Sequence, residues 1–194
     1  MIVDIFSRMI VGWSIHPDES ADHAGRLILE ACLEQGVERD QLILHSDNGG
    51  PMKGATMLAT LQFLGVLPSF SRPRVSDDNP YSESLFKTLK YRPEYPVKPF
   101  SSIEAAEVWV QTFANWYNYE HMHSGINYVP PFSRHIGADI EILKKRKATL
   151  EEAREMNPER WIQSKVRNCD SISNVILNPG KKPGKEVQML KKIC

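Results

Sequence analysis

Hydrophobic and polar positions in the first 120 residues predict an α/β domain. Residues 1–6 and 9–15 are apolar runs separated by the polar pair Ser7-Arg8, which predicts an antiparallel hairpin. Short apolar runs further along the chain predict two more strands, at residues 42–44, buried on both faces, and 66–70. Four helices are expected among them, the first and last with apolar residues every three or four positions: 20–36, 55–64, 79–90 and 101–119.

The remaining segments predict loops and a C-terminal extension. Residues 71–78 are polar and predict a mobile loop, and residues 92–100 contain three prolines and are expected to be extended. Pro130-Pro131 interrupts the chain before a charged helix with few apolar positions, expected at 139–155. We therefore divide the chain into three parts, which are a core at 1–137, a helical extension at 138–177 and a basic, disordered tail at 178–194.

Composition narrows the class of protein without identifying it. A hydrophobic content of 41% in 194 residues is enough for the core of one domain. The 24 basic and 24 acidic residues cancel, so any argument for nucleic-acid binding must come from local clusters. The three cysteines have neither zinc-site nor disulfide spacing. The absence of a membrane-length apolar run or signal-peptide pattern predicts a cytoplasmic protein that does not contact membranes.

A first candidate for chemistry follows the apolar run at 42–44. The chain continues His45-Ser46-Asp47-Asn48-Gly49-Gly50, so Asp47 is expected at the carboxyl edge of a sheet, where open α/β sheets bind ligands. The glycines would let a bulky substrate approach the backbone. A simple tight turn is the alternative, since Asp-Asn-Gly suits such turns without any chemistry.

A second candidate lies in the helix expected at 79–90. Glu83 falls in its first turn, and Lys87 and Lys90 share its face at spacings of four and seven. A carboxylate beside two cations suits a site that binds a metal ion and a DNA phosphate. Stabilisation of the helix dipole by Glu83 and a solvated ion pair with Lys87 are the alternatives. Nearby basic residues make the region basic overall: Arg72, Arg74 and Arg92.

These segments together resemble the transposases of bacterial insertion sequences that share the retroviral-integrase catalytic core. The resemblance extends from residue 1 to about residue 137, and 35 residues separate Asp47 from Glu83, as in that family. The matching segments are Asp4-Ile5-Phe6-Ser7-Arg8 through Trp13, His45-Ser46-Asp47-Asn48-Gly49, Asn79-Pro80-Tyr81-Ser82-Glu83 through Lys90, and Trp116-Tyr117-Asn118-Tyr119 with His123-Ser124.

The resemblance implies an RNase H-like fold, with a mixed β-sheet flanked by helices. It implies that Asp47 and Glu83 are the second and third members of an Asp-Asp-Glu triad that holds Mg²⁺ or Mn²⁺. The reaction would be cleavage and strand transfer of DNA phosphodiesters by a homo-multimer in the bacterial cytoplasm. The expected DNA contacts are Lys87, Lys90, Asn48, Arg72, Arg74 and Arg92, and Asn48 could instead orient Asp47.

The first member of the triad has no counterpart in the resemblance. That aspartate lies on the family's first strand, and the matching segment begins one strand later, so we expect an N-terminally truncated core that lacks this strand. Asp4 matches a position that is not catalytic, and we expect it to bond locally in a turn. The leading hypothesis is thus an incomplete transposase core. The alternatives are an inactive DNA-binding or transposase-interacting remnant and, less in keeping with the C-terminal extension, a ribonuclease.

Other residues admit both a functional and a structural interpretation. His45 could assist Asp47 or pack within its strand, and His121 and His123 could bind metal but suit loop histidines better. The basic run at 144–147 suits a solvated helix face or a contact with the DNA backbone. Aromatic residues of the long helix are expected mainly in the core or in subunit contacts: Trp109, Trp116, Tyr117 and Tyr119.

Overall fold

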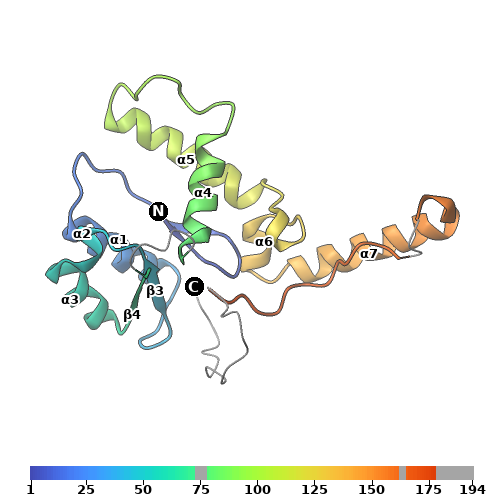
Figure 1. Cartoon of the computed structure of the whole chain (residues 1–194), viewed down its shortest axis with the longest axis horizontal. Coiled ribbons are helices and arrows are strands. Elements are labelled where there is room, and N and C mark those ends of the chain that lie inside the picture. The colour runs from blue at the N-terminus through green and yellow to red at the C-terminus, as the bar shows by residue number, and fades with distance from the viewer. Residues whose placement is uncertain (73–77, 162–164, 178–194) are drawn as a thin grey trace.

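The computed structural model describes residues 1–72, 78–161 and 165–177 (Figure 1). Short strands precede and alternate with helices in the first 70 residues, and helices follow from there on. In chain order the elements are β1 (Ile2–Val3), β2 (Ile10–Gly12), α1 (Ala21–Glu34), β3 (Ile43–Ser46), α2 (Gly50–Lys53), α3 (Ala55–Leu64), β4 (Leu67–Phe70), α4 (Pro80–Lys90), α5 (Ile103–Tyr119), the 3₁₀ turn η2 (Ser124–Ile126), α6 (Pro131–His135), α7 (Asp139–Met156) and η3 (Pro158–Arg160).

The strands form two separate two-stranded sheets in the described part of the chain. β1 and β2 pair antiparallel, as predicted for the hairpin, and β3 pairs parallel with β4 along its whole length. The sequence predicted one mixed sheet. Both strand orientations are present, but no described strand joins β1 to β3. A small hollow lies there instead, lined by apolar side chains that include Ile2, Val11, Leu42 and Leu44. For this reason β3 is half-buried, whereas a strand buried on both faces was predicted.

The first hydrophobic cluster, which we call the α1–α3 cluster, packs α1 against α3 and the strand segments beside them. Ser20 caps α1, where its hydroxyl accepts a hydrogen bond from the His23 N–H at 3.1 Å. Gly65 ends α3 with φ +69°, and a Cβ there would lie 2.9 Å from the Asp40 backbone nitrogen, so glycine is required. The buried members of the cluster are Ile28, Cys32, Leu42, Met57, Leu61 and Val66.

The second cluster, the α4–α5 cluster, lies on the other side of the β1–β2 hairpin. Ser102 caps α5 by accepting a hydrogen bond from the Ala105 N–H at 3.2 Å. The rings of Trp109 and Phe113 stack along one face of α5, with centroids 5.7 Å apart. The predicted helix over 101–119 is therefore confirmed. The buried members of this cluster are Ile10, Leu85, Leu89, Phe113, Ala114 and Tyr117.

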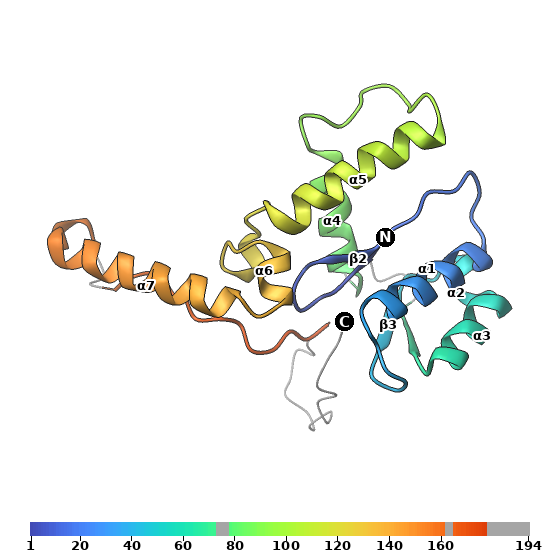
Figure 2. The same cartoon turned by 180° about the vertical axis from the view of Figure 1, so that it is seen from behind.

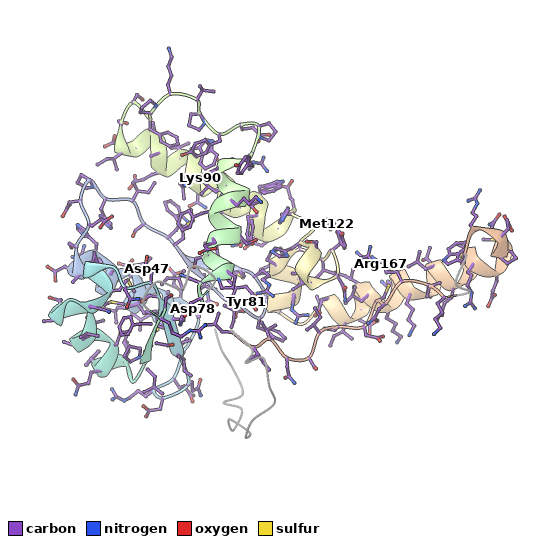
Figure 3. All side chains as sticks on the ribbon, in the orientation of Figure 1. Asp47, Asp78, Tyr81, Lys90, Met122 and Arg167 are labelled. Carbon is purple, nitrogen blue, oxygen red and sulfur yellow. The ribbon has the colours of Figure 1, made fainter. Side chains whose placement is uncertain are left out.

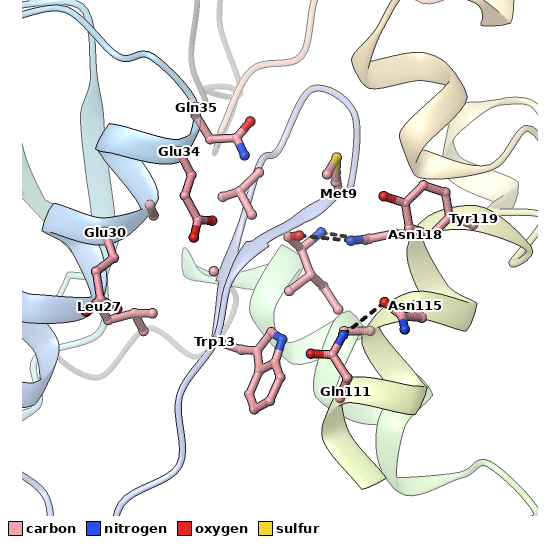
Figure 4. Close-up of a pocket in the computed structure, with 15 residues that line it drawn as sticks. Met9, Trp13, Leu27, Glu30, Glu34, Gln35, Gln111, Asn115, Asn118 and Tyr119 are labelled. Atoms are coloured by element: carbon pink, nitrogen blue, oxygen red, sulfur yellow. Dashed lines mark hydrogen bonds between the residues drawn. The ribbon is translucent and has the colours of Figure 1, made fainter. Parts of the chain in front are cut away.

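A polar groove of about 300 Å³ separates α1 from α5 beside β2 (Figure 4). Asn118 extends from α5 to the edge of β2, where its amide accepts a hydrogen bond from the Ile10 N–H at 2.9 Å and donates one to the Ile10 carbonyl at 3.0 Å. The side chain thus takes the place of a neighbouring strand for one residue of this edge, and it satisfies backbone groups that would otherwise need another partner.

The C-terminal elements form a projecting arm. Figures 1 and 2 show α7 extending away from the rest of the molecule, with the segment 165–177 running back beside it. Buried Arg134 anchors its base, because its guanidinium donates to the carbonyls of Phe6 (2.7 Å) and Ile172 (2.6 Å) and to the carboxylate of Asp139 (3.3 Å). The tail predicted to be disordered at 178–194 lies outside the described residues. Within the described ranges, no helix is both long and apolar enough to cross a membrane.

Candidate active site

Asp47 directly follows β3, at the carboxyl end of the parallel strand pair. Its side chain is exposed, and Oδ1 accepts a hydrogen bond from the Gly49 N–H at 3.0 Å. That bond is the Asx-type turn expected of Asp-Asn-Gly, and it leads directly into α2. The second carboxylate oxygen has no hydrogen bond to the described residues. The turn and the functional interpretations of this motif are therefore compatible, because the turn uses one oxygen.

Polar contacts join the end of β3 to the end of β4. The Asn48 amide donates to the Ser71 carbonyl at 2.6 Å, and His45 Nδ1 lies 3.0 Å from the hydroxyl of Ser69, its partner across the strands. His45 Nε2 lies 3.4 Å from the Ser71 hydroxyl. Both ring nitrogens of His45 thus face serines of the neighbouring strand and the residue after it, which supports the packed-strand interpretation of this histidine.

Glu83 lies in the first turn of α4, as predicted, and its side chain is exposed. The same helix buries Leu85 and Leu89 in the α4–α5 cluster, which fixes its rotation. Lys87 and Lys90 are also exposed. In Figure 3, Lys90 marks the far end of α4 from Tyr81, so the cations extend along the helix away from its first turn.

An ion pair between an exposed arginine and a buried aspartate connects the end of β4 to the start of α4. Asp78 is 2% exposed, and its carboxylate accepts hydrogen bonds from Arg72 Nε (2.9 Å), Nη2 (2.7 Å) and backbone N–H (2.7 Å). These bonds from Arg72 lower the pKa of Asp78 to about 2. We call this pair the Arg72–Asp78 clamp. Asp78 is a site residue that the sequence pattern did not predict, and its only local signal is its place in a polar loop six residues after an arginine.

The other predicted DNA contacts differ in how they are placed. Arg74 lies outside the described residues. Arg72 is held in the clamp, but 69% of its side chain is exposed. The guanidinium of Arg92 lies 3.7 Å from the Trp116 ring centroid and 3.0 Å from a Glu94 carboxylate oxygen, and only 20% of its side chain is exposed. The guanidinium of Arg92 thus contacts Trp116 with its planar face and Glu94 with its edge. Lys87 and Lys90, by contrast, are exposed to solvent.

Asp4 bonds locally in the hairpin turn, as predicted. Its carboxylate accepts hydrogen bonds from the N–H groups of Phe6 and Ser7, each at 3.0 Å, and from the Ser7 hydroxyl at 2.5 Å. His135 approaches the same carboxylate at 3.4 Å. The hydrogen bonds, against the opposing effect of burial, lower the pKa of Asp4. This carboxylate is therefore fully occupied in holding the turn against α6.

His121 and His123 pack against aromatic rings. The ring centroid of His121 lies 4.8 Å from that of Trp116 and 5.3 Å from that of Tyr117. Burial, with the nearby charges of His121 and Arg8, lowers the pKa of His123 to about 4. His123 is therefore neutral at neutral pH, and its ring accepts a hydrogen bond from the Gly125 N–H at 3.0 Å. These contacts match the loop interpretation of both histidines.

The donor chemistry of Asp47 and Glu83 suits a hard divalent cation. Both carboxylates are exposed and supply oxygen ligands, the type that Mg²⁺ and Mn²⁺ prefer. In the described ranges, no group of three or more histidine, cysteine, aspartate or glutamate side chains is gathered closely enough to hold a metal ion. The pair therefore fits such an ion chemically, as part of a larger ligand set.

Comparison with known proteins places these residues in a family. Residues 1–76 and residues 64–131 each match a model of the integrase core domain. The chain is 34% identical over 131 residues to the transposase for insertion sequence element IS904 of Lactococcus lactis, and the match covers 66% of this chain and 51% of that protein. It is 31% identical over 90 residues to transposase InsF for insertion sequence IS3A of Escherichia coli, which covers 46% of this chain and 31% of InsF.

The chain thus spans about half, or less, of the length of these curated relatives. The two family matches together run without a gap from residue 1 to residue 131, and they include both Asp47 and Glu83. An integrase core implies an RNase H-like architecture, with which the hairpin, the parallel strand pair and the flanking helices are consistent. The chain belongs to the integrase core domain family, and the curated proteins to which it is similar are insertion-sequence transposases.

Proposed function

We propose that this chain is the catalytic part of a transposase that cleaves and joins DNA phosphodiesters with Asp47 and Glu83. The observation that carries the proposal is the position of the two carboxylates. Asp47 follows β3, and Glu83 opens the helix that the Arg72–Asp78 clamp ties to the end of β4. Both acids are thereby linked to the carboxyl ends of the same parallel strands, where α/β proteins bind ligands.

Asp47 and Glu83 would hold Mg²⁺ or Mn²⁺, and a bound ion of this kind supplies an activated nucleophile and stabilises the leaving oxygen. Lys87 and Lys90, exposed beyond Glu83, would bind phosphates on either side of the reacting bond. Asn48 would hold the backbone after Asp47 in place through Ser71. The remaining proposed DNA contacts are Arg72, Arg74 and Arg92. The proposal also includes assembly of several copies on DNA.

We propose further that the reaction needs a third carboxylate. The resemblance assigns that role to an aspartate on the family's first strand, which has no counterpart among residues 1–194, and Asp4 is occupied by the hairpin turn. Two carboxylates hold one ion adequately at best, so little or no joining is expected from residues 1–194 alone. The alternative function, an inactive module that binds DNA or an intact transposase, follows if metal binding is absent.

Metal binding by the 194-residue chain is the first test. We expect Mn²⁺ to broaden the amide NMR signals of Gly49 and Ser84, the neighbours of the two acids, and we expect Asp47→Asn or Glu83→Gln to abolish that broadening. Glu107→Gln, an exposed acid on α5, is the matched control and should leave it unchanged. Broadening that persists in both variants would overturn the assignment of these acids.

The second test measures joining of a labelled DNA end by a form of the protein extended at its N-terminus by a strand that carries the third acid. Asp47→Asn and Glu83→Gln should each reduce joining by at least about a hundredfold, in line with the loss of a group that acts at the reacting bond. Undiminished joining in either variant would contradict the proposal. Metal-independent binding of duplex DNA, without joining by any form, would favour the inactive module.

A further inference from the structure

The projecting helix α7 has no continuous apolar face that would pack its 18 residues against the rest of the molecule. Only Asp139 and Leu143 of its 18 residues are buried, and its packed contacts with the rest of the molecule involve Leu143, Ile142 and Leu150. A helix that is polar around most of its circumference usually bridges to a partner or depends on its own charge pairs. The arrangement of charged residues along α7 therefore indicates which kind of partner its surface would bind.

The basic run at 144–147 does not form one face. Arg146 turns inward, where its guanidinium donates to the carbonyls of Asn127 and Tyr128. Lys144, Lys145 and Lys147 are exposed, but Lys145 lies on a different side of the helix from the other two. The run therefore divides into a structural arginine and lysines that point in different directions.

One exposed stripe of α7 has its charges sorted by sign. At 100° per residue its members fall within about 80° of the circumference, and they are Ile140, Lys144, Lys147, Glu151 and Glu155, of which Glu151 is half-buried and the other four are exposed. The basic pair comes first and the acidic pair second. The neighbouring stripe, Glu141, Lys145 and Glu152, alternates in sign instead and can pair along the helix.

Grouping like charges next to one another destabilises an isolated helix. Lys144 and Lys147 are neighbours at a spacing of three, and Glu151 and Glu155 are neighbours at a spacing of four, so each pair repels. Among the described residues, the partners of these lysines are distant and exposed: Glu141 lies 4.0 Å from Lys144, and Asp170 lies 3.7 Å from Lys147. In the part of the chain that the structure describes, neither Glu151 nor Glu155 forms an ion pair. Opposite charges from another molecule would relieve both repulsions.

We propose that this stripe is a self-association surface, on which α7 of a second copy of the chain packs antiparallel. With a twofold axis near residue 149, Lys144 of one copy lies opposite Glu155 of the other, and Lys147 lies opposite Glu151, each pair occurring twice. A C₂ contact of this kind must be self-complementary, which a basic half followed by an acidic half provides. Ile140, 58% exposed at the end of the stripe, adds apolar area at both ends of the contact.

Charge also decides against DNA as the occupant of this face. The distal half of the arm carries four carboxylates, on Glu151, Glu152, Glu155 and Glu159, and a phosphate backbone would repel them. In a contact with a second copy, by contrast, both the acids and the lysines of the stripe pair with opposite charges. The surface extends beyond residue 131, where the integrase-core match ends, and the proposal does not depend on the metal site.

Sedimentation velocity of the full 194-residue chain tests the proposal without DNA or metal. We expect association at about 0.1 M salt that weakens at about 1 M, where the screening length falls from ~10 Å to ~3 Å. The double variants Lys144→Glu with Lys147→Glu, and Glu151→Lys with Glu155→Lys, should each weaken association at least tenfold. Circular dichroism would verify that both remain helical.

Restoration is the decisive measurement. The two double variants mixed together carry opposite charges and should associate again as a heterodimer, and the fourfold charge swap in one chain should associate with itself. The matched control is Lys98→Glu with Lys145→Glu, which makes the same charge change off the stripe and should associate normally. Equal association in all variants would overturn the proposal, as would lysine reversals that weaken only duplex DNA binding.

Discussion

The two proposed catalytic acids are carried by different halves of the molecule. Asp47 follows β3, and Leu42 just before this strand and Leu44 within it pack into the α1–α3 cluster. Glu83 precedes Leu85, which is buried in the α4–α5 cluster. Apolar packing fixes each half. Between the acids the connections are polar, namely the Asn48–Ser71 hydrogen bond and the Arg72–Asp78 clamp. The stability of each half therefore depends on apolar packing, whereas the alignment of the two acids depends on polar contacts.

The β1–β2 hairpin also connects the halves. Ile10 belongs to the α4–α5 cluster, whereas Gly12 lies against α1, where an added Cβ would be 3.2 Å from that of Ala31. The hairpin is short, and the described strands do not join the two sheets. We therefore expect the two halves to respond separately to mutation, and the following experiments test that expectation.

Truncation within each cluster has the largest expected effect. Phe113→Ala should cost about 3–5 kcal/mol and Met57→Ala about 2–5 kcal/mol, because both side chains are almost fully buried and would leave cavities. Hydrogen exchange should show loss of protection mainly in α4 and α5 for the first variant and in α1 and α3 for the second. Equal loss over both clusters in either variant would show that they unfold as one unit.

Asn118→Asp should have a smaller effect, confined to the edge of β2. The carboxylate still accepts from the Ile10 N–H but cannot donate to the Ile10 carbonyl, so a buried acceptor loses its partner at a cost of about 1–3 kcal/mol. Urea unfolding measures this loss. Asn115→Asp is the control and should change stability little, because Asn115 is exposed on the same helix and accepts a hydrogen bond from Gln111. A similar loss in both variants would contradict the role given to Asn118.

The helix caps offer a matched pair of still smaller changes. Ser20→Ala removes the cap of α1 and Ser102→Ala that of α5, each at about 1 kcal/mol. Thermal unfolding should show a similar total loss for both. Hydrogen exchange should assign the first loss to α1 and the second to α5, and the separation of the halves is contradicted if either cap affects both helices.

The Arg72–Asp78 clamp should have the smallest effect on global stability, because Arg72 is largely exposed and solvent screens the pair. The folded-state pKa of Asp78 is lowered to about 2. The clamp therefore stabilises the fold above the usual aspartate pKa, and that contribution is lost as pH falls from about 4 through about 2. Asp78→Asn should remove this component of the acid sensitivity, measured by urea unfolding at several pH values.

The same variant should affect the site more than the fold. We expect Asp78→Asn to increase hydrogen exchange in the first turn of α4 and to weaken Mn²⁺ binding, while protection in α1 and α3 stays unchanged. Asp18→Asn, which changes an exposed acid outside the site, is the control. Unchanged exchange at the start of α4 would show that the clamp does not hold Glu83 in place.

Local sequence patterns were enough to predict the longer helices and to place Asp47 after a strand and Glu83 in a first helical turn. The predicted helices at 55–64 and 79–90 agree with α3 and α4 within a residue at each end, because Gly65 after the first and Pro80 at the start of the second are local signals. The family resemblance was visible because it rests on these short segments and their spacing.

The partners of the buried and half-buried polar groups became known from the tertiary structure alone. The tertiary structure pairs Asp78 with Arg72, Arg146 with the loop before α6, and Asn118 with the edge of β2. These hydrogen-bond partners lie between 6 and 108 positions apart in the sequence. The tertiary structure also separated the expected mixed sheet into two pairs. A hydrogen bond or a strand pairing depends on which distant groups packing brings together, and residue type and spacing along the chain carry little of that information.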